Sequence, residues 1–368
     1  MTDQTSDKSD AAKQAAPEAR EPSSVGQLNE RTAKRQRMLL AGIATVLLAG
    51  ASYVILGSDH SKKSHEEGEA ETIETASLVN RNLSQREFTT VYGNRLDAVT
   101  RDQKALKDSG TIALGHRESS IPFSYLDGNQ KPVGYSMELC NKIVDAVKKE
   151  LKMPALVTKL TPVTSQTRIP LMTNGTIDLE CGSTTNSLER QKQVAFGVTT
   201  FVSPVRMVVK ADSGIKTLDD LNGKAVATTT GTTSDRYIKQ NEKGHNIDVK
   251  NVYGKDHAES FLMVETGRAS AFVMDEVLLA GFIANAKNPK DFAIVGPALS
   301  TEPYGIMLRK DDPQFKALVD KTLSGLMKSG EINKIYAKWF TSPIPPKNVN
   351  LNLPMNAQLQ EAIKNPND

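Results

Sequence analysis

The sequence is short of cysteine and of aromatic residues, and its charges nearly cancel. Among 368 residues there are two cysteines, Cys140 and Cys181, and they do not form a metal-ligand spacing. The net charge is +3, and no arginine-rich stripe with interleaved aromatic residues stands out against that balance. A nucleic-acid interface is therefore not expected. No pattern in the sequence indicates a metal or another cofactor.

Two further motifs are missing. The turn at residues 230–233, Thr-Gly-Thr-Thr, lacks the Gly-Lys-Ser/Thr ending that a nucleotide-binding loop needs. No cysteine follows the apolar run near the N-terminus, so a lipoprotein anchor is not indicated.

The N-terminal third contains one segment that can cross a membrane. We expect residues 1–37 to be a disordered cytoplasmic leader, because they are polar and lack an apolar period. Residues 38–57 carry no charge and are long enough to span a bilayer core. Basic residues before this run and acidic ones after it place the N-terminus in the cytoplasm. Residues 58–105 are expected to form a polar tether.

The apolar run has a competing interpretation, a cleaved signal peptide. Ala49-Gly50-Ala51 fits a cleavage site for such a peptide. We favour a retained anchor, because the leader is unusually long and the apolar run continues past that site. Under either interpretation the globular part is exported.

From about residue 106, the chain is long enough for two globular lobes. Segments with strand character alternate with segments whose apolar residues recur at helical spacing. This alternation predicts an α/β fold with parallel sheets and ligand chemistry at the carboxyl ends of the strands.

The most informative stretch is residues 178–190. A short apolar run ends in Asp178-Leu179-Glu180 and is followed by Gly-Ser-Thr-Thr and then by a predicted helix start at Ser187. Free backbone N–H groups and hydroxyls at a helix start are typical of an anion site, although this stretch taken alone favours a plain polar loop. Residues 228–234 form a second hydroxyl-rich turn of this kind.

Arginines and hydroxyls follow several of the predicted strands. Three arginines, each beside hydroxyl donors, indicate a site that holds more than one carboxylate. The residues of this set are Arg117, Ser165, Arg168, Ser183, Thr185 and Arg190.

Taken together, several motifs resemble those of the bacterial periplasmic glutamate/aspartate-binding proteins of ABC transporters, within solute-binding protein family 3. The resemblance covers the chain from about residue 106 onward, but not the first hundred residues. The main motifs are GHRESSIPFSY at 115–125, TSQTRIP at 164–170, ECGSTTN at 180–186 and MLRKDDP at 307–313.

The resemblance implies a two-lobed periplasmic-binding-protein fold of type II that closes on its ligand through two hinge crossings. Lobe 1 would comprise residues 106–208 and 301–346, and lobe 2 residues 209–300. Residues 347–368 would be a C-terminal tail. Family members often have a cysteine at the position of Ile306; here the second cysteine is Cys140, and its pairing with Cys181 stays open.

The resemblance also implies a ligand set. Arg190 and Thr185 would take the ligand's α-carboxylate, and Asp275, with a carbonyl near Ser183, would hold its ammonium. The full set is Arg117, Ser165, Arg168, Ser183, Thr185, Arg190, His257, Asp275, Thr229 and Thr232, the last two contributed by lobe 2.

For the other end of the ligand, the resemblance implies that Arg117 and Arg168, helped by Ser165 and His257, take the side-chain carboxylate. A dicarboxylic amino acid has two anions and one cation, which fits three arginines, one acid and neutral donors. The expected ligand is therefore L-glutamate or L-aspartate.

We accordingly expect a monomeric binding protein without enzymatic activity. It would be periplasmic, tethered to the inner membrane by residues 38–57, and would deliver its ligand to the permease subunits of an ABC transporter. Two alternatives stay open. One is a cyclohexadienyl-dehydratase-like enzyme on the same fold, for which Glu118 and Glu180 are the available acids. The other is a membrane-anchored amino-acid sensor, although no kinase, receiver or methyl-accepting segment is apparent.

Overall fold

The structure is a computed structural model that describes residues 106–367. The predicted leader, apolar run and tether all lie outside these residues. Within the described part of the chain, no helix is both long and apolar enough to cross a membrane.

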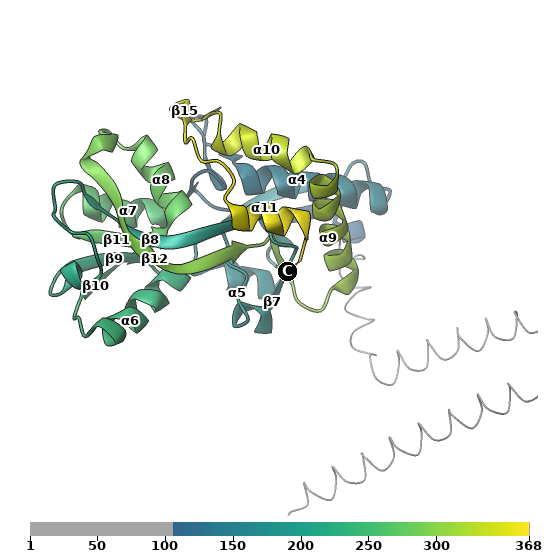
Figure 1. Cartoon of the computed structure of the whole chain (residues 1–368). Coiled ribbons are helices and arrows are strands. Elements are labelled where there is room, and N and C mark those ends of the chain that lie inside the picture. Colours follow the sequence, from purple (N-terminus) through teal and green to yellow (C-terminus); the bar gives the residue numbers. More distant parts are fainter. Residues whose placement is uncertain (1–105, 368) are drawn as a thin grey trace, which may run out of the picture. The chain divides into compact units, whose positions relative to one another are not determined.

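Two five-stranded sheets organise the described residues into two lobes (Figure 1). In the first sheet the strand order is β5-β1-β6-β13-β7. β1 pairs in parallel with β5 and β6, whereas β13 runs antiparallel to β6 and β7. The bounds are β1 Thr111–His116, β5 Val157–Pro162, β6 Leu179–Glu180, β7 Val194–Phe196 and β13 Met307–Arg309.

The second sheet has the order β10-β9-β11-β8-β12. β9 pairs in parallel with β10 and β11, and β8 runs antiparallel to both β11 and β12. The bounds are β8 Phe201–Lys210, β9 Ala225–Thr229, β10 Lys250–Gly254, β11 Ala271–Asp275 and β12 Phe292–Tyr304.

Both sheets are therefore mixed, and the expectation of purely parallel sheets is wrong. Strict alternation of strand and helix makes neighbouring strands parallel. The chain departs from that alternation where it passes between the lobes, because β8 and β12 cross without an intervening helix. As a result, β8 in the second sheet and β13 in the first run opposite to the other strands of their sheets.

The two crossing strands form the hinge of the fold. β8 and β12 pair antiparallel from Lys210 opposite Phe292 to Phe201 opposite Tyr304, with an irregularity between Val295 and Ser300. At the end that lies in the first lobe, Phe201 stacks on Phe340 with ring centroids 5.0 Å apart, and the ring of Tyr304 lies 5.8 Å from that of Phe201. Buried aromatic contacts of this kind hold the ends of the hinge strands firmly in the first lobe.

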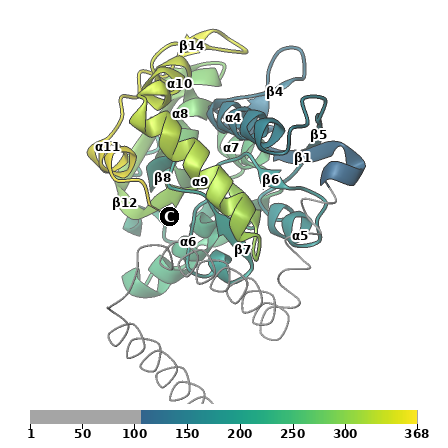
Figure 2. The ribbon, with the colours of Figure 1, turned by 90° about the vertical axis from the view of Figure 1, so that its right-hand side faces the viewer.

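Helices cover the sheets, and α4, α9 and α10 pack side by side on the first lobe (Figure 2). The helix bounds are α4 Tyr135–Glu150, α5 Arg168–Thr173, α6 Thr233–His245, α7 His257–Glu265, α8 Glu276–Asn285, α9 Pro313–Lys328, α10 Glu331–Phe340 and α11 Ala357–Lys364. Three short 3₁₀ helices are η1 Arg190–Lys192, η2 Asp219–Leu221 and η3 Pro289–Asp291. The remaining strands are β2 Ser119–Ser120, β3 Ser124–Leu126, β4 Pro132–Val133, β14 Pro343–Ile344 and β15 Val349–Asn350.

A disulfide joins Cys140 of α4 to Cys181, the residue that follows β6, with the two Cα atoms 6.1 Å apart. Both cysteines are fully buried. The pairing that the sequence left open is thus made, and it ties α4 to the loop that leads into residues 183–185.

The residues assigned to a C-terminal tail contain a helix, α11, that packs on β8. Its cap residue Asn356 accepts a hydrogen bond from Leu359 N at 2.8 Å and donates one to Val202 O at 2.9 Å. Leu359 is fully buried. The end of the chain therefore lies against a hinge strand.

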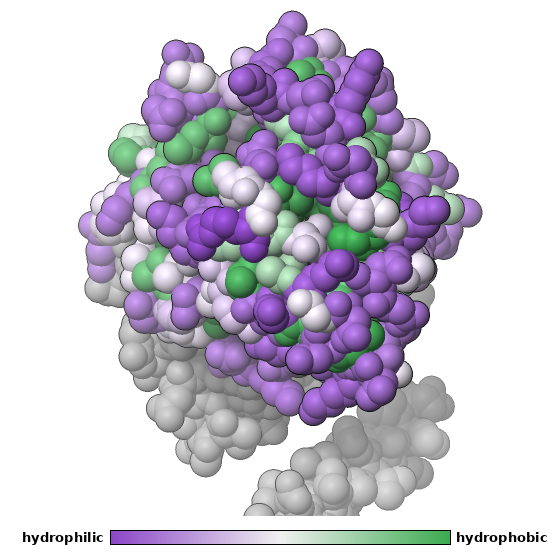
Figure 3. Space-filling model, turned by 90° about the vertical axis from the view of Figure 1, so that its left-hand side faces the viewer, coloured by the Kyte–Doolittle hydropathy of each residue, from purple (hydrophilic) through white to green (hydrophobic). Residues whose placement is uncertain are grey.

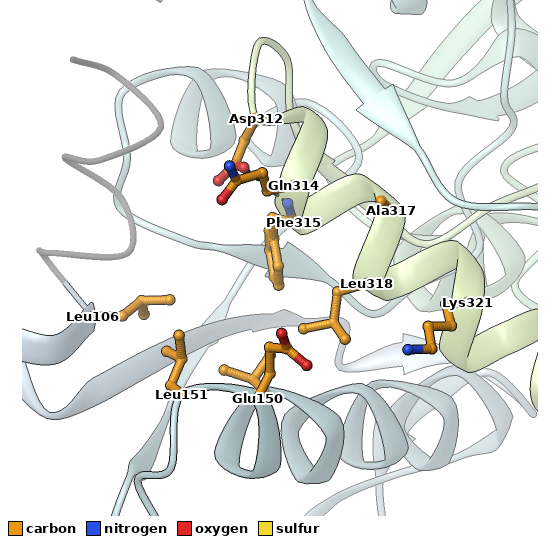
Figure 4. A pocket seen from close by; sticks show the side chains of 10 residues that line it. Leu106, Glu150, Leu151, Asp312, Gln314, Phe315, Ala317, Leu318 and Lys321 are labelled. Carbon is orange, nitrogen blue, oxygen red and sulfur yellow. Dashed lines mark hydrogen bonds between the residues drawn. The ribbon is translucent and has the colours of Figure 1, made fainter. Parts of the chain in front are cut away.

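Two surface features lie away from the strand ends where the predicted site residues fall. A groove on the first lobe, between α4 and α9, is lined by apolar residues such as Leu151, Phe315 and Leu318, with Glu150 and Lys321 nearby (Figure 4). At the other end of the molecule, on the face formed by the second lobe, hydrophobic residues are scattered among hydrophilic ones (Figure 3).

Candidate functional site

The predicted site residues come together where the carboxyl ends of the strands of both sheets face each other. Arg117 follows β1, and Arg168 opens α5 in the first lobe. From the second lobe, Thr229 ends β9, His257 opens α7 and Asp275 ends β11. Residues more than a hundred positions apart thus meet in one place, as the strand-end argument predicts.

A small cavity lies between the two lobes. Seven of the ten predicted residues line it: Ser165, Arg168, Ser183, Thr185, Thr232, His257 and Asp275. Thr233 and Met274 also line it and were not predicted. The other three predicted residues, Arg117, Arg190 and Thr229, surround the cavity through the contacts described below.

Arg117 is held by a chain of hydrogen bonds from the second lobe. Its Nη2 lies 3.4 Å from Nε2 of His257, whose Nδ1 lies 3.0 Å from Oγ1 of Thr229. Since a guanidinium only donates, Nε2 accepts and Nδ1 carries the proton that it donates to Thr229. Burial, reinforced by the charges of Arg117 and Arg168, lowers the pKa of His257 well below its ordinary value. The imidazole is therefore neutral at pH 7.

Arg168 is fixed by its own lobe. Its Nη1 donates to Oγ1 of Thr184 at 2.6 Å, and the Thr184 hydroxyl donates to Oε2 of Glu180 at 2.6 Å. All three residues are buried. Burial lowers the pKa of Arg168, and the negative charge of Glu180 opposes that effect.

Arg190 lies at the closing edge of the two lobes. Its Nη1 donates to Thr185 O at 2.9 Å, and its Nη2 lies 3.4 Å from Gly231 O in the second lobe. Burial and the charge of Arg168 lower its pKa to about 9. Next to it, Glu189 forms an ion pair with Arg236 of α6, so the lobes touch on both sides of Arg190.

The predicted helix at Ser187 is only the three-residue 3₁₀ turn η1. Ser187 Oγ does accept a hydrogen bond from Arg190 N at 3.3 Å, as a cap would. However, the chain leaves the turn for β7 at once, so a helix macrodipole does not contribute to anion binding here. The arginine side chain remains the cation at this edge.

Asp275 supplies a carboxylate in a cavity otherwise rich in arginine. It is almost fully buried. Burial, together with the nearby charge of Glu302, raises its pKa to about 8. Glu302 is itself held by hydroxyls, with Thr233 Oγ1 donating at 2.9 Å and Ser300 Oγ at 2.6 Å. A cation placed beside Asp275 would favour its ionised form.

Buried polar atoms without a hydrogen-bond partner gather at this cavity. Buried polar groups are normally paired, so a cluster of unpaired ones indicates a missing partner. The cluster has donors on arginines and serines, and acceptors on Asp275 and Glu180. In the described part of the chain these atoms are Arg117 Nη1, Arg168 Nε, Ser165 Oγ, Ser183 Oγ, Asp275 Oδ1 and Glu180 Oε1.

The two acids considered for an enzymatic role do not stand free in the cavity. Glu118 is exposed to solvent. Glu180 is buried, but its Oε2 accepts the hydrogen bond from Thr184. Neither carboxyl lines the cavity, so neither is placed as a general acid there.

Five residues in or around the cavity were not among the ten predicted ligand residues: Thr184, Glu180, Glu302, Thr233 and Met274, of which Glu180 was considered only as an acid for the enzymatic alternative. Thr184 lies between two residues that were predicted, so the hydroxyl-rich run itself was the available signal. No sequence pattern indicates that Glu302 is part of the site, because a single acidic residue beside a proline is typical of an exposed loop. Its burial follows only from the pairing of β8 with β12, which places Glu302 opposite Ser203.

Comparison with known proteins finds a matching family and relatives with similar names. Residues 112–342 match the model of the bacterial extracellular solute-binding proteins, family 3. The L-glutamate/L-aspartate-binding protein of Pseudomonas aeruginosa is 52% identical over 273 residues, which cover 74% of this chain and 90% of that protein. The glutamate/aspartate import solute-binding protein of Escherichia coli is 49% identical over 276 residues, covering 75% and 89%.

A solved structure shares the fold. A crystal structure of a mutant of ArgBP from T. maritima is 31% identical and superposes with a TM-score of 0.57, covering 64% of this chain and 98% of that one.

Proposed function

Because the chain belongs to the bacterial extracellular solute-binding proteins of family 3, we propose that it binds L-glutamate and L-aspartate outside the cytoplasmic membrane for an ABC transporter. Relatives at 49–52% identity carry names for this binding or import. Those names favour transport over a dehydratase or a sensor. The ligand would pass to the permease subunits of the transporter.

The observation that carries the proposal is the set of unpaired buried atoms. An acidic amino acid brings two carboxylates and one ammonium. In and around the cavity, Arg117, Arg168, Ser165 and Ser183 offer unpaired donors, and Asp275 and Glu180 offer unpaired acceptors. A ligand with these charges would satisfy both kinds of atom at once, and pairing would offset the burial that shifts the arginine and aspartate pKa values.

The α-amino-acid end of the ligand would lie between Arg190 and Asp275. Arg190 and Thr185 are neighbours through the hydrogen bond to the Thr185 carbonyl. They would take the α-carboxylate, while Asp275, near Ser183, would take the ammonium. Thr232 caps α6, lines the cavity from the second lobe and would offer its hydroxyl to the ligand.

The side-chain carboxylate would bind to Arg117 and Arg168, with Ser165 beside them. His257 would serve this pair chiefly by orienting Arg117, since both ring nitrogens already have partners in Arg117 and Thr229. In this role a neutral imidazole is useful, because it accepts from the guanidinium without adding a repelling charge.

The family places the protein outside the cytoplasmic membrane. We further propose that residues 38–57 tether it to the inner membrane, that it works as a monomer, and that it binds without catalysing a reaction. An uncharged run of this length supports the tether. Extraction of the protein from membranes only by detergent would test that part.

The test of the binding function is calorimetry on the purified full-length protein with a panel of amino acids. Glutamate and aspartate should bind much more tightly than glutamine, arginine and histidine. Arg190→Ala should weaken both acidic ligands by about 2–5 kcal/mol, because it removes a buried partner of a carboxylate. Arg168→Ala should bring glutamate affinity down toward that of glutamine.

Arg268→Ala removes an exposed arginine and is the matched control, which should bind like the wild type. Tight binding of arginine or histidine by the wild type, with no binding of glutamate, would refute the proposed ligand. Near-normal glutamate affinity in Arg190→Ala would refute the role given to that residue.

A further inference from the structure

We infer that Thr184 and Glu180 are positioning residues that aim Arg168 at the ligand's side-chain carboxylate, and so set the preference for a charged side chain over a neutral one. This inference rests on the proposed function and deepens it. Neither residue lines the cavity, so both would act through the arginine.

The hydrogen bonds have one consistent direction. A guanidinium donates and does not accept, so Arg168 Nη1 donates to Thr184 Oγ1 at 2.6 Å. The single hydroxyl proton of Thr184 is then left to point to Oε2 of Glu180, also at 2.6 Å. A bond to a carboxylate polarises the hydroxyl and strengthens its acceptance from the arginine. Arg168 keeps its Nε buried and without a hydrogen-bond partner.

The loop that carries Thr184 is held rigidly. Cys181 is bonded to Cys140 of α4, and Gly182 O accepts a hydrogen bond from Ser136 Oγ at 2.7 Å. On its other side, Thr184 O accepts from Gly305 N at 3.2 Å. Because the backbone on both sides of Thr184 is fixed in this way, its hydroxyl can hold the arginine in one orientation before a ligand binds.

Glu180 lies close to the second arginine as well. A Cβ added at Gly182 would meet Glu180 Oε1 at 2.2 Å and Arg117 Cγ at 2.9 Å, so only glycine leaves room for the two side chains at this point. Moreover, the charge of Glu180 raises the pKa of Arg117, Arg168 and Arg190 against the lowering by burial. One buried carboxylate therefore supports three buried guanidinium groups.

The variant Thr184→Val tests the inference, because it removes the hydroxyl at nearly constant volume. The ratio of glutamate to glutamine affinity should fall about 10- to 100-fold, as expected for losing a hydrogen bond to a charged group. Thr184→Ser restores the hydroxyl and should return the ratio to within about twofold of the wild type. If Thr184→Val does not fold, Thr184→Ala removes the same hydroxyl with less bulk.

A second readout needs no ligand. Guanidinium protons held by hydrogen bonds exchange slowly with water, so Arg168 should give a resolved side-chain NMR signal, assigned by its loss in Arg168→Lys. That signal should disappear in Thr184→Val and persist in Thr184→Ser. An unchanged signal and an unchanged affinity ratio in Thr184→Val would overturn the inference. A wild type that binds no acidic amino acid would instead refute the proposed function, while the NMR signal still decides the positioning role.

Discussion

Closure of the two lobes depends on a glycine in the second lobe, Gly231. It lies in the turn between β9 and α6 with φ of +81°, and an added Cβ would lie 2.8 Å from Cα and N of Gln166 and 2.9 Å from C of Ser165. Those atoms are backbone of the first lobe, so neither side can yield by turning a side chain. Because the contact joins the two lobes, we expect it only in the closed form.

Gly231→Ala should therefore weaken glutamate binding specifically. Forcing backbone apart in a packed interface costs about 1–3 kcal/mol. That cost falls on the closed, ligand-bound form, and it corresponds to a loss of about 5- to 150-fold in affinity. The positive φ adds about 1–2 kcal/mol of strain, but the strain is present in open and closed forms alike and appears in the stability to unfolding instead. Calorimetry and thermal unfolding of the same sample separate the two effects.

A matched control isolates the steric effect. Gly267 is also in the second lobe, with φ of +74°, and a Cβ there would meet nothing within 4 Å. Gly267→Ala should lose a similar amount of stability and keep its glutamate affinity. If Gly231→Ala bound glutamate as tightly as Gly267→Ala does, the lobes would not close on the ligand with the contact seen here.

Two further predictions concern pH and the disulfide. Asp275, with its pKa raised to about 8 by burial and by Glu302, must lose a proton before it pairs with an ammonium. Glutamate affinity should thus rise about tenfold per pH unit from pH 6 to 8 and then level off, whereas Asp275→Asn should bind weakly with a flat profile. A flat wild-type profile, measured by calorimetry in several buffers, would contradict this. Cys140→Ser should lower the unfolding free energy by about 3–4 kcal/mol through the loop that the disulfide closes; unchanged denaturant midpoints for oxidised wild type and variant would contradict that.

Much of the fold could be predicted from local sequence pattern. The pattern predicts helices over residues 313–328 and 331–339, and the structure has them at Pro313–Lys328 and Glu331–Phe340. Asp312 as cap and Pro313 mark the start of the first, and apolar spacing marks both. The length of β12 could not be predicted from such local patterns. We expect a strand at residues 292–295, yet it continues to Tyr304 past Gly296 and Pro297. Its length comes from pairing with β8, which no local window contains.

In the candidate site too, the positions of residues could be predicted from the sequence, but their contacts could not. Chemistry-bearing residues that follow strands were predictable one by one, since each arginine or hydroxyl stands beside a recognisable strand end. What each one touches was not. The family resemblance implies that His257 helps to bind the ligand, whereas in the structure its two ring nitrogens lie against Arg117 and Thr229. Contacts of that kind join residues 140 and 28 positions apart: the first crosses between the lobes and the second is made by the packing of α7 on β9.

For the stretch from Asp178 to Arg190, the predicted helix was wrong, but the loop does contain buried charged residues. We predict anion binding there partly from an expected helix start, whereas the structure has only a three-residue 3₁₀ turn. The loop nevertheless holds buried charge, because its hydroxyls are anchored by other means: a disulfide to α4, a bond from Ser136 and the buried carboxylate of Glu180. Rigid side-chain anchoring replaces the dipole of a helix. It follows that anion binding here should depend on single contacts, and that removing one hydroxyl, as in Thr184→Val, should lower the selectivity for a charged ligand side chain.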